Sequence, residues 1–422
     1  MPQFSEQSPL EQYDQAYYDI LQVRLLQLVS ELFPEIKGSS QMIIEEIGWG
    51  SYNQVMGVTI WQSEPFQGLA ATVQNFFSRL CRTAKVQRSS DHQDYAIRFP
   101  FHDGNEFTIL GNDMGRDVAV LQILQSCLAI PLPKVIKYDL GKDNALQKPY
   151  ILQNRIRGQT LEVLMDTLNS KQMTHIVEKI AAITAPAAGM ISGENAADIR
   201  GWESKLKQFA VPTYTVAEAF PDYAQPSAEP AQAQTPLKYL IVHCQRWLAY
   251  EASMGYSKNE ALWADIIVVA RSLDRLGLLG DCFHLVHDDL FPRNILAEVK
   301  DSTSVEIRGI IDWDISFFAP KCVAFRPPYW AWIGEDAQER DEGNARIEPE
   351  DDTGVSLQEA FLTAASDEYI RFGFSQEGVF ARQLFYVVER GVLTPCEVDL
   401  ANMLVSQWRT LYPSDFTNSD SW

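Results

Sequence analysis

Cysteine is scarce in this chain of 422 residues, and its six cysteines are widely spaced. They stand at Cys81, Cys127, Cys244, Cys282, Cys322 and Cys396. No two of them form a Cys-x-x-Cys pair, so the spacing argues against both a disulfide framework and a structural zinc site. We expect six reduced thiols in a reducing compartment.

The chain also lacks an excess of positive charge and a long apolar run. It has 35 Lys and Arg against 56 Asp and Glu, a net charge of −21. This charge repels phosphate backbones and anionic lipids, so neither a nucleic acid nor a membrane is an expected partner. The longest apolar runs are typified by 266–270, far short of the roughly 20 residues that span a bilayer. The polar, acidic stretch 1–15 has no leader pattern, so the expected location is cytoplasmic.

Hydrophobic periodicity indicates an α+β protein in two lobes. Apolar residues recur at helical spacing over 13–33, and short strand-like runs follow between 41 and 110, interrupted by a helical, then polar, insert near 65–90. After a helix and two more strands, the pattern beyond 158 is mostly helical. The predicted domains are a helical extension at 1–40, a small antiparallel β lobe at 41–152, and a hinge with a larger helical lobe at 153–422.

Two polar stretches interrupt the helical half of the chain. Residues 220–236 are rich in Pro and Ala, and residues 335–352 carry nine acidic residues against two arginines. We expect both to be solvated surface loops.

The densest chemical signal is the segment Leu-Val-His-Asp-Asp-Leu-Phe-Pro-Arg-Asn-Ile-Leu at 285–296. It contains Asp289 and Asn294 on a loop whose proline excludes a helix. After a predicted hairpin, an apolar strand ends at Asp312. This set of residues suits phosphoryl transfer. One carboxylate would accept or orient the proton of the attacking hydroxyl, and the second carboxylate and the amide oxygen would be ligands for Mg²⁺.

Each of these residues taken alone has a more ordinary interpretation. An Asp in a loop is usually a turn former or a helix cap, and a histidine such as His287 is more often a hydrogen-bonded structural residue than a base. The order of the residues favours a catalytic role over a structural one. A loop Asp, an Asn five positions later and an Asp at the end of a strand would otherwise have to occur together in this order by chance.

A glycine-rich turn lies upstream, between two strand-like runs, and contains Gly48, Gly50, Ser51, Tyr52 and Asn53. Glycine lets backbone N–H groups approach an oxyanion, although most such turns are simple hairpins. The turn is not a Walker A loop, because no Gly-Lys-Ser/Thr follows and no helix begins there.

Arg98 lies in the alternating strand Tyr-Ala-Ile-Arg-Phe-Pro. Taken alone, it is best interpreted as a cation exposed at a sheet edge, although a guanidinium also grips two phosphate oxygens as a fork. Asp117, at the start of the next helix, either holds this arginine or simply favours the helix N-terminus.

These motifs together resemble the aminoglycoside phosphotransferase and choline kinase-like family, small-molecule relatives of protein kinases, and its fungal members most. The family's loop His-Gly-Asp-Leu-x-Pro-x-Asn-Ile-Leu stands here at 287–296, and its Ile-Asp-Trp-acidic metal motif at 311–314. Segments 130–140 and 149–161 are similar to the family's hinge region. The resemblance covers about 41–330 and implies a protein-kinase-like fold.

Carried over residue by residue, the resemblance implies that Asp289 is the catalytic carboxylate and that Asn294 and Asp312 hold Mg²⁺. The implied nucleotide-binding residues are Gly48, Gly50, Ser51, Tyr52, Asn53, Arg98, Asp117, Gln153, Asn154 and Ile156. The implied activity is ATP-dependent, Mg²⁺-assisted transfer of the γ-phosphoryl group to a hydroxyl of a small molecule.

Three departures from the family pattern support an alternative. Arg98 replaces the usual lysine, Asp117 replaces the usual glutamate, and the insert near 65–90 has no clear counterpart in the family. Asp288 also replaces the glycine of the family's loop and adds a charge beside Asp289. The alternative is a catalytically impaired, pseudokinase-like binding or scaffolding protein with the same fold.

The sequence constrains the phosphate acceptor only weakly. The acidic run at 335–352, with Trp330 and Trp332 nearby, suits an amino-bearing or cationic hydroxylated metabolite. The preference for ATP over GTP and the oligomeric state stay open.

Overall fold

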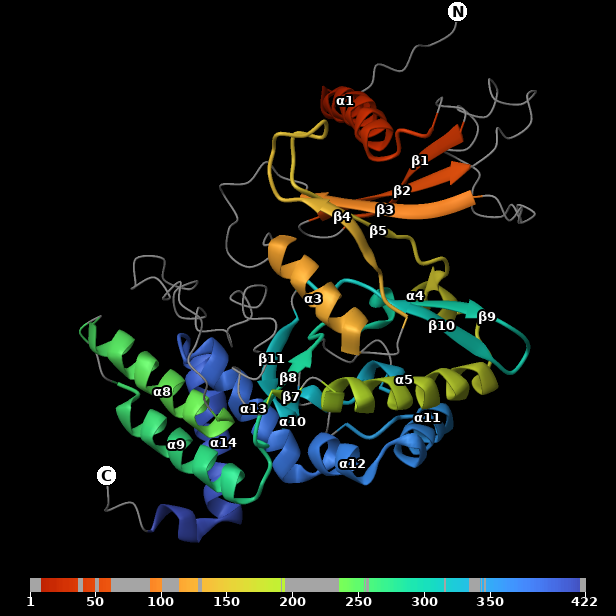
Figure 1. Cartoon of the computed structure of the whole chain (residues 1–422). Coiled ribbons are helices and arrows are strands. Elements are labelled where there is room, and N and C mark those ends of the chain that lie inside the picture. Colours follow the sequence, from red (N-terminus) through yellow and green to blue (C-terminus); the bar gives the residue numbers. More distant parts are fainter. Residues whose placement is uncertain are drawn as a thin grey trace, which may run out of the picture. The chain divides into compact units, whose positions relative to one another are not determined.

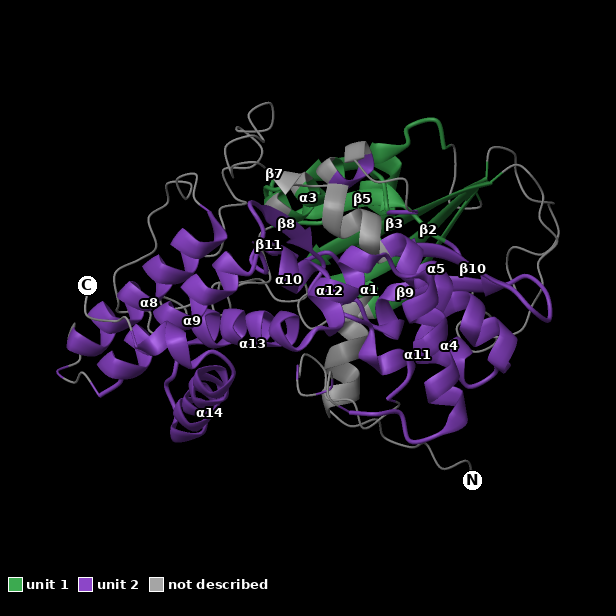
Figure 2. Ribbon diagram, turned by 90° about the horizontal axis from the view of Figure 1, so that it is seen from below, with its two compact units in different colours: residues 1–122, 133–156 green, residues 123–132, 157–422 purple. Residues whose placement is uncertain are grey.

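The computed structural model describes most of the chain, in two compact units. The described residues are 9–36, 41–49, 53–61, 92–100, 114–127, 131–190, 192–193, 235–253, 255, 258–314, 316–333, 342, 344 and 347–417. Unit 1 comprises residues 1–122 and 133–156, and unit 2 comprises residues 123–132 and 157–422 (Figure 2).

A five-stranded antiparallel sheet forms the centre of unit 1, with strand order β1-β2-β3-β5-β4 (Figure 1). Its strands are β1 (Met42–Trp49), β2 (Asn53–Trp61), β3 (His92–Pro100), β4 (Val135–Asp139) and β5 (Tyr150–Asn154). The sheet confirms the predicted strands in this half. The helical insert predicted near 65–90 and the strand-like run at 106–110 lie outside the described residues.

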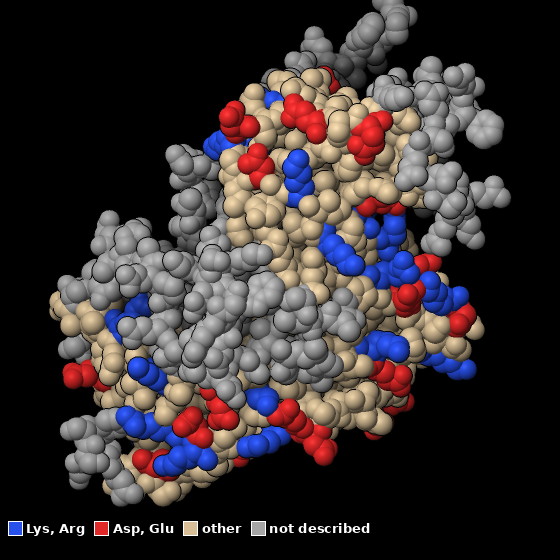
Figure 3. All heavy atoms as spheres, viewed as in Figure 1, with Lys and Arg blue, Asp and Glu red and all other residues tan. Residues whose placement is uncertain are grey.

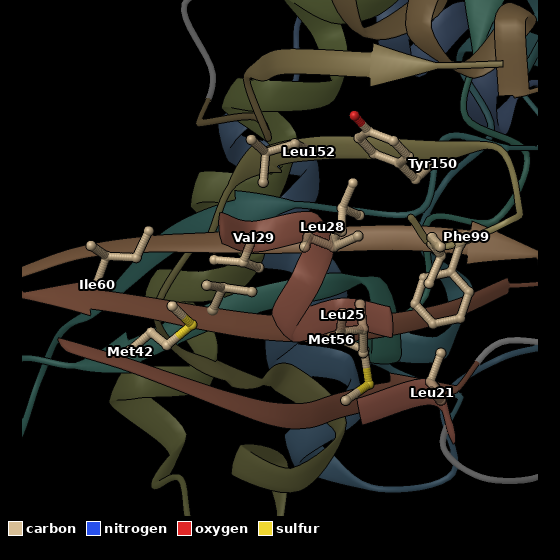
Figure 4. Packing of buried hydrophobic residues seen from close by; sticks show 13 residues of the cluster. Leu21, Leu25, Leu28, Val29, Met42, Met56, Ile60, Phe99, Tyr150 and Leu152 are labelled. Carbon is tan, nitrogen blue, oxygen red and sulfur yellow. The ribbon is translucent and has the colours of Figure 1, made fainter. Parts of the chain in front are cut away.

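The N-terminal helix α1 (Pro9–Leu32) covers one face of this sheet. Its Leu21, Leu25, Leu28 and Val29 are each at most 4% exposed and pack on alternate residues of the strands, as Figure 4 shows. Full burial of each such side chain contributes about 1.5–3 kcal/mol, so α1 is an integral part of the sheet's core.

The buried stripe of α1 is narrower than its sequence predicts. Ile20 and Val23 fit a broad helical stripe, yet they are 55% and 66% exposed. Among the described side chains of the helix, those buried against the sheet are Leu21, Leu25, Leu28 and Val29. They share one face, because residues three and four positions apart lie one above the other on a helix. The predicted helix is therefore confirmed, and Ile20 and Val23 lie outside its buried face.

The opposite face of the sheet carries the helix α3 (Met114–Cys127). Met114 and Val118 of this helix pack against Ile151 of β5 and Val135 of β4. Side chains alternate along a strand, so residues next to those of the α1 cluster point toward this second face.

Unit 2 is mostly helical and includes two small antiparallel sheets. Its α-helices are α4 (Leu161–Met165), α5 (Ser170–Met190), α8 (Pro236–Ser253), α9 (Glu260–Arg275), α10 (Lys321–Ala324), α11 (Asp352–Ala364), α12 (Asp367–Phe374), α13 (Gln376–Arg390) and α14 (Pro395–Leu411). Its strands are β6 (Gln159–Thr160), β7 (Ser192–Gly193), β8 (Phe283–Val286), β9 (Ile295–Val299), β10 (Val305–Ile310) and β11 (Phe317–Pro320). Sheet and helices together confirm the α+β prediction.

The acidic run at 335–352 is not simply a solvated loop where it is described. Glu342 is 4% exposed and accepts a hydrogen bond of 2.6 Å from Arg382 Nε, while Arg326 Nε lies 3.1 Å from its other oxygen. Two guanidinium groups explain how a carboxylate can be buried there. Residues 334–341, 343 and 345–346 lie outside the described part, as does most of the 220–236 loop.

The described residues also bear on the expected thiols, surface charge and membrane partner. Cys244, Cys282, Cys322 and Cys396 are free thiols. On the face drawn in Figure 3, the acidic and basic side chains of the described residues lie intermixed. Within the described ranges, no helix is long and apolar enough to cross a membrane.

Candidate active site

Two loops of unit 2 are brought together by the pairing of four strands. The first leaves β8, passes through the short 3-10 helix η3 (Pro292–Asn294) and enters β9, while the second, at 311–316, leaves β10 and enters β11. β8 pairs with β11, so the first loop begins beside the end of the second. β9 pairs with β10, so the first loop ends beside the beginning of the second. The Ile311 N–H donates to the Asn294 carbonyl at 3.0 Å and joins them.

The carboxylate of Asp289 is held from both sides within the first loop. Asn294 Nδ2 donates to Asp289 Oδ2 at 2.7 Å, and Arg293 Nη2 donates to Oδ1 at 2.7 Å. Asp289 is 8% exposed. Two donors on one small carboxylate leave it a single orientation, as expected of a group that must be aimed at a reacting atom.

Asn294 and Asp312 offer oxygen atoms suited to a divalent cation. The Asn294 amide nitrogen donates to Asp289 through both its carboxylate and its backbone carbonyl, at 2.7 and 2.8 Å, which leaves Oδ1 as an acceptor. Asp312 is exposed and forms no hydrogen bond or ion pair with any described residue. Its φ of +65° is rare for a residue with a side chain, and such strain is concentrated at functional sites.

The donor set fits Mg²⁺ better than a softer metal. Among the described residues, no three His, Cys, Asp or Glu side chains converge as a ready-made metal cage. Mg²⁺ needs no such cage, because it keeps several waters and is commonly held by one or two protein oxygens together with substrate phosphates. Asn294 and Asp312 would therefore be its protein ligands.

His287 bridges the two loops in its neutral form. Its Nδ1 accepts from the Asp289 N–H at 3.3 Å, so Nε2 carries the ring proton and donates to the Ile311 carbonyl at 2.9 Å. Burial lowers the pKa of His287 below its usual value. The ring also packs on Trp313, with centroids 4.4 Å apart. These hydrogen bonds agree with the expectation that His287 is a hydrogen-bonded residue within the loop.

In unit 1, Arg98 is buried, so the edge-exposed interpretation of this residue was wrong. It lies on β3, which has neighbours on both sides, and is 7% exposed. Its neighbours Ile97 and Phe99 point into the α1 cluster, so Arg98 points to the opposite face. There its Nη2 lies 3.2 Å from Asp117 Oδ2, in the first turn of α3.

The glycine-rich turn is described only at its two ends. Gly48 lies near the end of β1, after a bulge at Ile47, and Asn53 begins β2 and is 5% exposed. A Cβ on Gly48 would meet nothing within 4 Å, so no described atom requires glycine there. Gly50, Ser51 and Tyr52 lie outside the described residues.

The expected adenine-binding segment belongs largely to the sheet. Gln153 and Asn154 lie in β5, which is paired on both edges by β3 and β4. The Asn154 N–H donates to the Lys134 carbonyl at 3.0 Å. Of the three expected residues only Ile156 lies beyond the strand.

Two arginines near these residues were missed in the sequence. Arg293 stands inside the 285–296 motif, four residues after Asp289, so the spacing of a possible ion pair was visible. Arg155 forms an ion pair with Glu45 and lies against Gly57, where a Cβ would come within 2.6 Å of its Nη1. Glu45 and Arg155 are 110 positions apart, and no local pattern indicates such a pair.

Comparison with known proteins places these residues in a family. The sequence model of a phosphotransferase enzyme family, APH, matches residues 81–320, which is 240 of the chain's 422 residues. This chain belongs to that phosphotransferase family. Its described elements form the α+β fold expected from the sequence. The elements α1, β1 and β2 precede the matched region; β1 and β2 belong to the five-stranded sheet, and α1 packs on it.

Individual relatives are more distant. The altered inheritance of mitochondria protein 9, mitochondrial, of Debaryomyces hansenii is 30% identical over 107 residues, which cover 25% of this chain and only 17% of that protein. A GDP and kanamycin complex of an APH(2″) enzyme is 14% identical, with a TM-score of 0.43, covering 94% of this chain and 99% of that one. A complex of the aminoglycoside phosphotransferase APH(4)-Ia with ADP and hygromycin B is 11% identical, with a TM-score of 0.42, covering 92% and 97%.

Proposed function

We propose that this phosphotransferase is an ATP-dependent kinase that phosphorylates a hydroxyl of a small molecule. The hydroxyl oxygen attacks the γ-phosphorus, the bond from that phosphorus to the β-γ bridging oxygen breaks, and ADP leaves. Asp289 accepts or orients the proton of the attacking hydroxyl. The products are a phosphate monoester and ADP, with the hydroxyl proton released to Asp289 and then to solvent.

The other residues bind and neutralise charge. Asn294 and Asp312 would hold Mg²⁺, which when bound neutralises the charge on the nucleotide phosphates. Arg98, fixed by Asp117, would contact the phosphates as a fork of N–H donors. Arg293 adds positive charge beside Asp289 and restricts its carboxylate.

One observation carries this proposal: the paired, singly oriented carboxylate of Asp289 lies in a loop joined by hydrogen bonds to the loop of Asp312. Arg293 and Asn294 each donate to one oxygen of the Asp289 carboxylate and fix its orientation. Asp312 is instead exposed on strained backbone without a described partner. That combination favours a binding role for Asp312 over a structural one.

A direct test measures ATP consumption and phosphorylated product over a panel of hydroxylated metabolites, with and without amino groups. Asp289→Asn preserves the shape of the side chain and removes its charge, and turnover should fall on the order of 10²-fold or more. Asp399→Asn is the matched control, because Asp399 is exposed on α14, which packs mainly on α9 and α13. Undiminished turnover of Asp289→Asn would remove Asp289 from its assigned role.

The scaffolding alternative predicts a different outcome. A binding protein without turnover would phosphorylate nothing in the panel, and neither ATP nor ADP would raise its thermal stability in an Mg²⁺-dependent way. A kinase that merely lacks its acceptor in the panel still shows Mg²⁺-dependent stabilisation by nucleotide. The two measurements together therefore separate a missing acceptor from a missing activity.

A cytoplasmic location is part of the proposal. Fractionation of cells that express a tagged copy tests it directly, with mitochondria as the competing compartment because of the name of the Debaryomyces hansenii relative.

A further inference from the structure

The residue before the candidate catalytic carboxylate adopts an unusual backbone conformation. Asp288 has a φ of +56°, in the left-handed region that glycine enters freely and that strains a residue with a Cβ. Asn and Asp tolerate this region better than other residues, because their short polar side chains can form local hydrogen bonds. The turn at 288 therefore needs either a glycine or a side chain that is held in place.

The side chain of Asp288 is held by a helix far away in the sequence. The Tyr386 hydroxyl donates to Asp288 Oδ1 at 3.0 Å, across 98 positions of the chain. Tyr386 lies on α13 and is 7% exposed. Burial, with the nearby Asp288 carboxylate, raises the pKa of Tyr386 well above its usual value, so the hydroxyl keeps its proton.

The helix that carries Tyr386 is itself firmly anchored. One turn earlier on α13, Arg382 is fully buried and donates to the carbonyls of Phe372 and Gly373 at 2.7 Å each. The same guanidinium is paired with Glu342. A donor on such an element has little freedom, so it can hold a partner in one place.

The loop around Asp289 is held on both flanks. On one side Asp288 is bonded to Tyr386, and on the other the Trp330 Nε1–H donates to the Leu290 carbonyl at 3.0 Å. Both donors come from segments later in the chain than the loop itself. The Asp289 backbone is therefore set between two contacts that the 285–296 motif does not contain.

We propose that Asp288 and Tyr386 form a positioning pair, which holds the strained turn that aims the Asp289 carboxylate. The hydrogen bond does for Asp288 what the absence of a Cβ does for glycine: it makes the left-handed conformation accessible. This inference rests on the proposed function only in that Asp289 is the group being aimed. Neither Asp288 nor Tyr386 is assigned a contact with substrate.

Four substitutions separate positioning from other roles of Asp288. Asp288→Asn keeps the acceptor and tolerates the turn, but it removes the charge. Asp288→Gly relieves the turn and loses the contact, whereas Asp288→Ala keeps the strain and loses the contact. Tyr386→Phe removes only the donor.

The expected kinetic result is an ordered series in kcat. Asp288→Asn and Asp288→Gly should each stay within about threefold of wild type, because both accept the turn, and Tyr386→Phe should lose about tenfold, the worth of one hydrogen bond to a charged group. Asp288→Ala should lose more. The double variant Asp288→Gly with Tyr386→Phe should be no worse than either single one, because both remove the same contact. KM for ATP should stay within about twofold throughout.

Three results would overturn the proposal. Tyr386→Phe with wild-type kcat would show that the contact does not position the loop. Asp288→Asn as impaired as Asp288→Ala would show that the charge matters rather than the hydrogen bond. Strictly additive losses in the double variant would show that the two residues act separately.

A second measurement keeps the test independent of the proposed function. Hydrogen exchange of a peptide covering 287–294 reports the amides of Phe291 and Asn294, which donate to Asp289 and Phe291 carbonyls at 2.9 Å. Tyr386→Phe should speed this exchange at least several-fold, and Asp288→Asn should not. If wild type phosphorylates nothing, the proposed function fails, while faster exchange in Tyr386→Phe still supports the pair and unchanged exchange refutes it.

Discussion

Each unit of this member of the phosphotransferase enzyme family contains an arginine–aspartate pair, and the two pairs differ in burial. In unit 1, Arg98 and Asp117 lie 3.2 Å apart with side chains 9% and 5% exposed. In unit 2, Arg293 and Asp289 lie 2.7 Å apart with side chains 37% and 12% exposed. The first pair is taken out of water, whereas the arginine of the second is partly solvated.

The difference in burial predicts which pair changes the stability more when it is broken. Removing one partner of a buried pair leaves a charge in a low-dielectric environment, which costs far more than loss of a surface pair. The solvated Arg293 contributes little to stability, yet it restricts the orientation of Asp289. We therefore expect opposite responses when the two pairs are broken.

The largest expected effect is on stability, from Asp117→Ala. Without this carboxylate, the buried Arg98 guanidinium loses a charged partner, and the free energy of unfolding should fall by about 3–5 kcal/mol in urea denaturation. The double variant Arg98→Met with Asp117→Leu should recover part of the loss, because it removes both charges. If Asp117→Ala were as stable as wild type, the two pairs would not differ in their contribution to stability.

The next effect concerns metal and nucleotide, through Asp312→Ala. With Mg²⁺·ATP at about 100 times its Kd, wild type should gain about 2.7 kcal/mol of stability. Removal of Mg²⁺ by a chelator, or Asp312→Ala with Mg²⁺ present, should abolish the metal-dependent part of this gain. Asp399→Ala is the control, and a full gain in Asp312→Ala would exclude Asp312 as a metal ligand.

Breaking the second pair should change activity more than stability. Arg293→Gln should lower kcat about tenfold, since one charge-assisted hydrogen bond to Asp289 is lost. Its free energy of unfolding should change by less than about 1 kcal/mol, because the guanidinium is more than one third exposed. Arg409→Gln, which breaks the exposed pair with Asp265, should leave both quantities near wild type. A large loss of stability in Arg293→Gln would contradict the comparison.

The smallest effect is a pH dependence confined to unit 2. Burial lowers the pKa of His287, so the unfolded chain takes up a proton near pH 6.5 that the folded state accepts only at lower pH. The stability linked to neutral His287 is thus present above about pH 6.5 and is lost as the pH falls below it, by at most about 1.4 kcal/mol per pH unit.

Urea denaturation at pH 7.5, 6.5 and 5.5 measures this dependence. His287→Asn lacks the titrating group, so its stability should fall less steeply than that of wild type between pH 6.5 and 5.5. Equal slopes in the two proteins would mean that His287 does not resist protonation in the folded state.

The candidate site was predictable from the sequence to the extent that it is local. Asp289, Arg293 and Asn294 lie within six residues, and the proline at 292 keeps them out of a regular helix. Their mutual contacts are therefore made within one loop. The strands around them were also predictable, because alternating apolar residues appear directly in the sequence.

The burial of a residue that depends on the order of strands in the sheet was not predictable in the same way. Arg98 was expected at an edge, because a lone cation on a strand usually lies there. The order β1-β2-β3-β5-β4 places β3 inside the sheet instead. That order results from the pairing of β3 with β5, whose sequence lies about fifty positions away. Glu342 was likewise expected in solvent, and only the approach of Arg326 and Arg382 buries it.

The amino-acid sequence by itself determined the family, the α+β class and the identity of the residues in the 285–314 motif. These follow from patterns within a few residues of one another, where chain connectivity already limits the geometry. The tertiary structure alone decided that Arg98 is buried against Asp117, and that Tyr386 of α13 holds Asp288 from 98 positions away. Contacts between distant segments depend on how whole elements pack, and no local pattern records that packing.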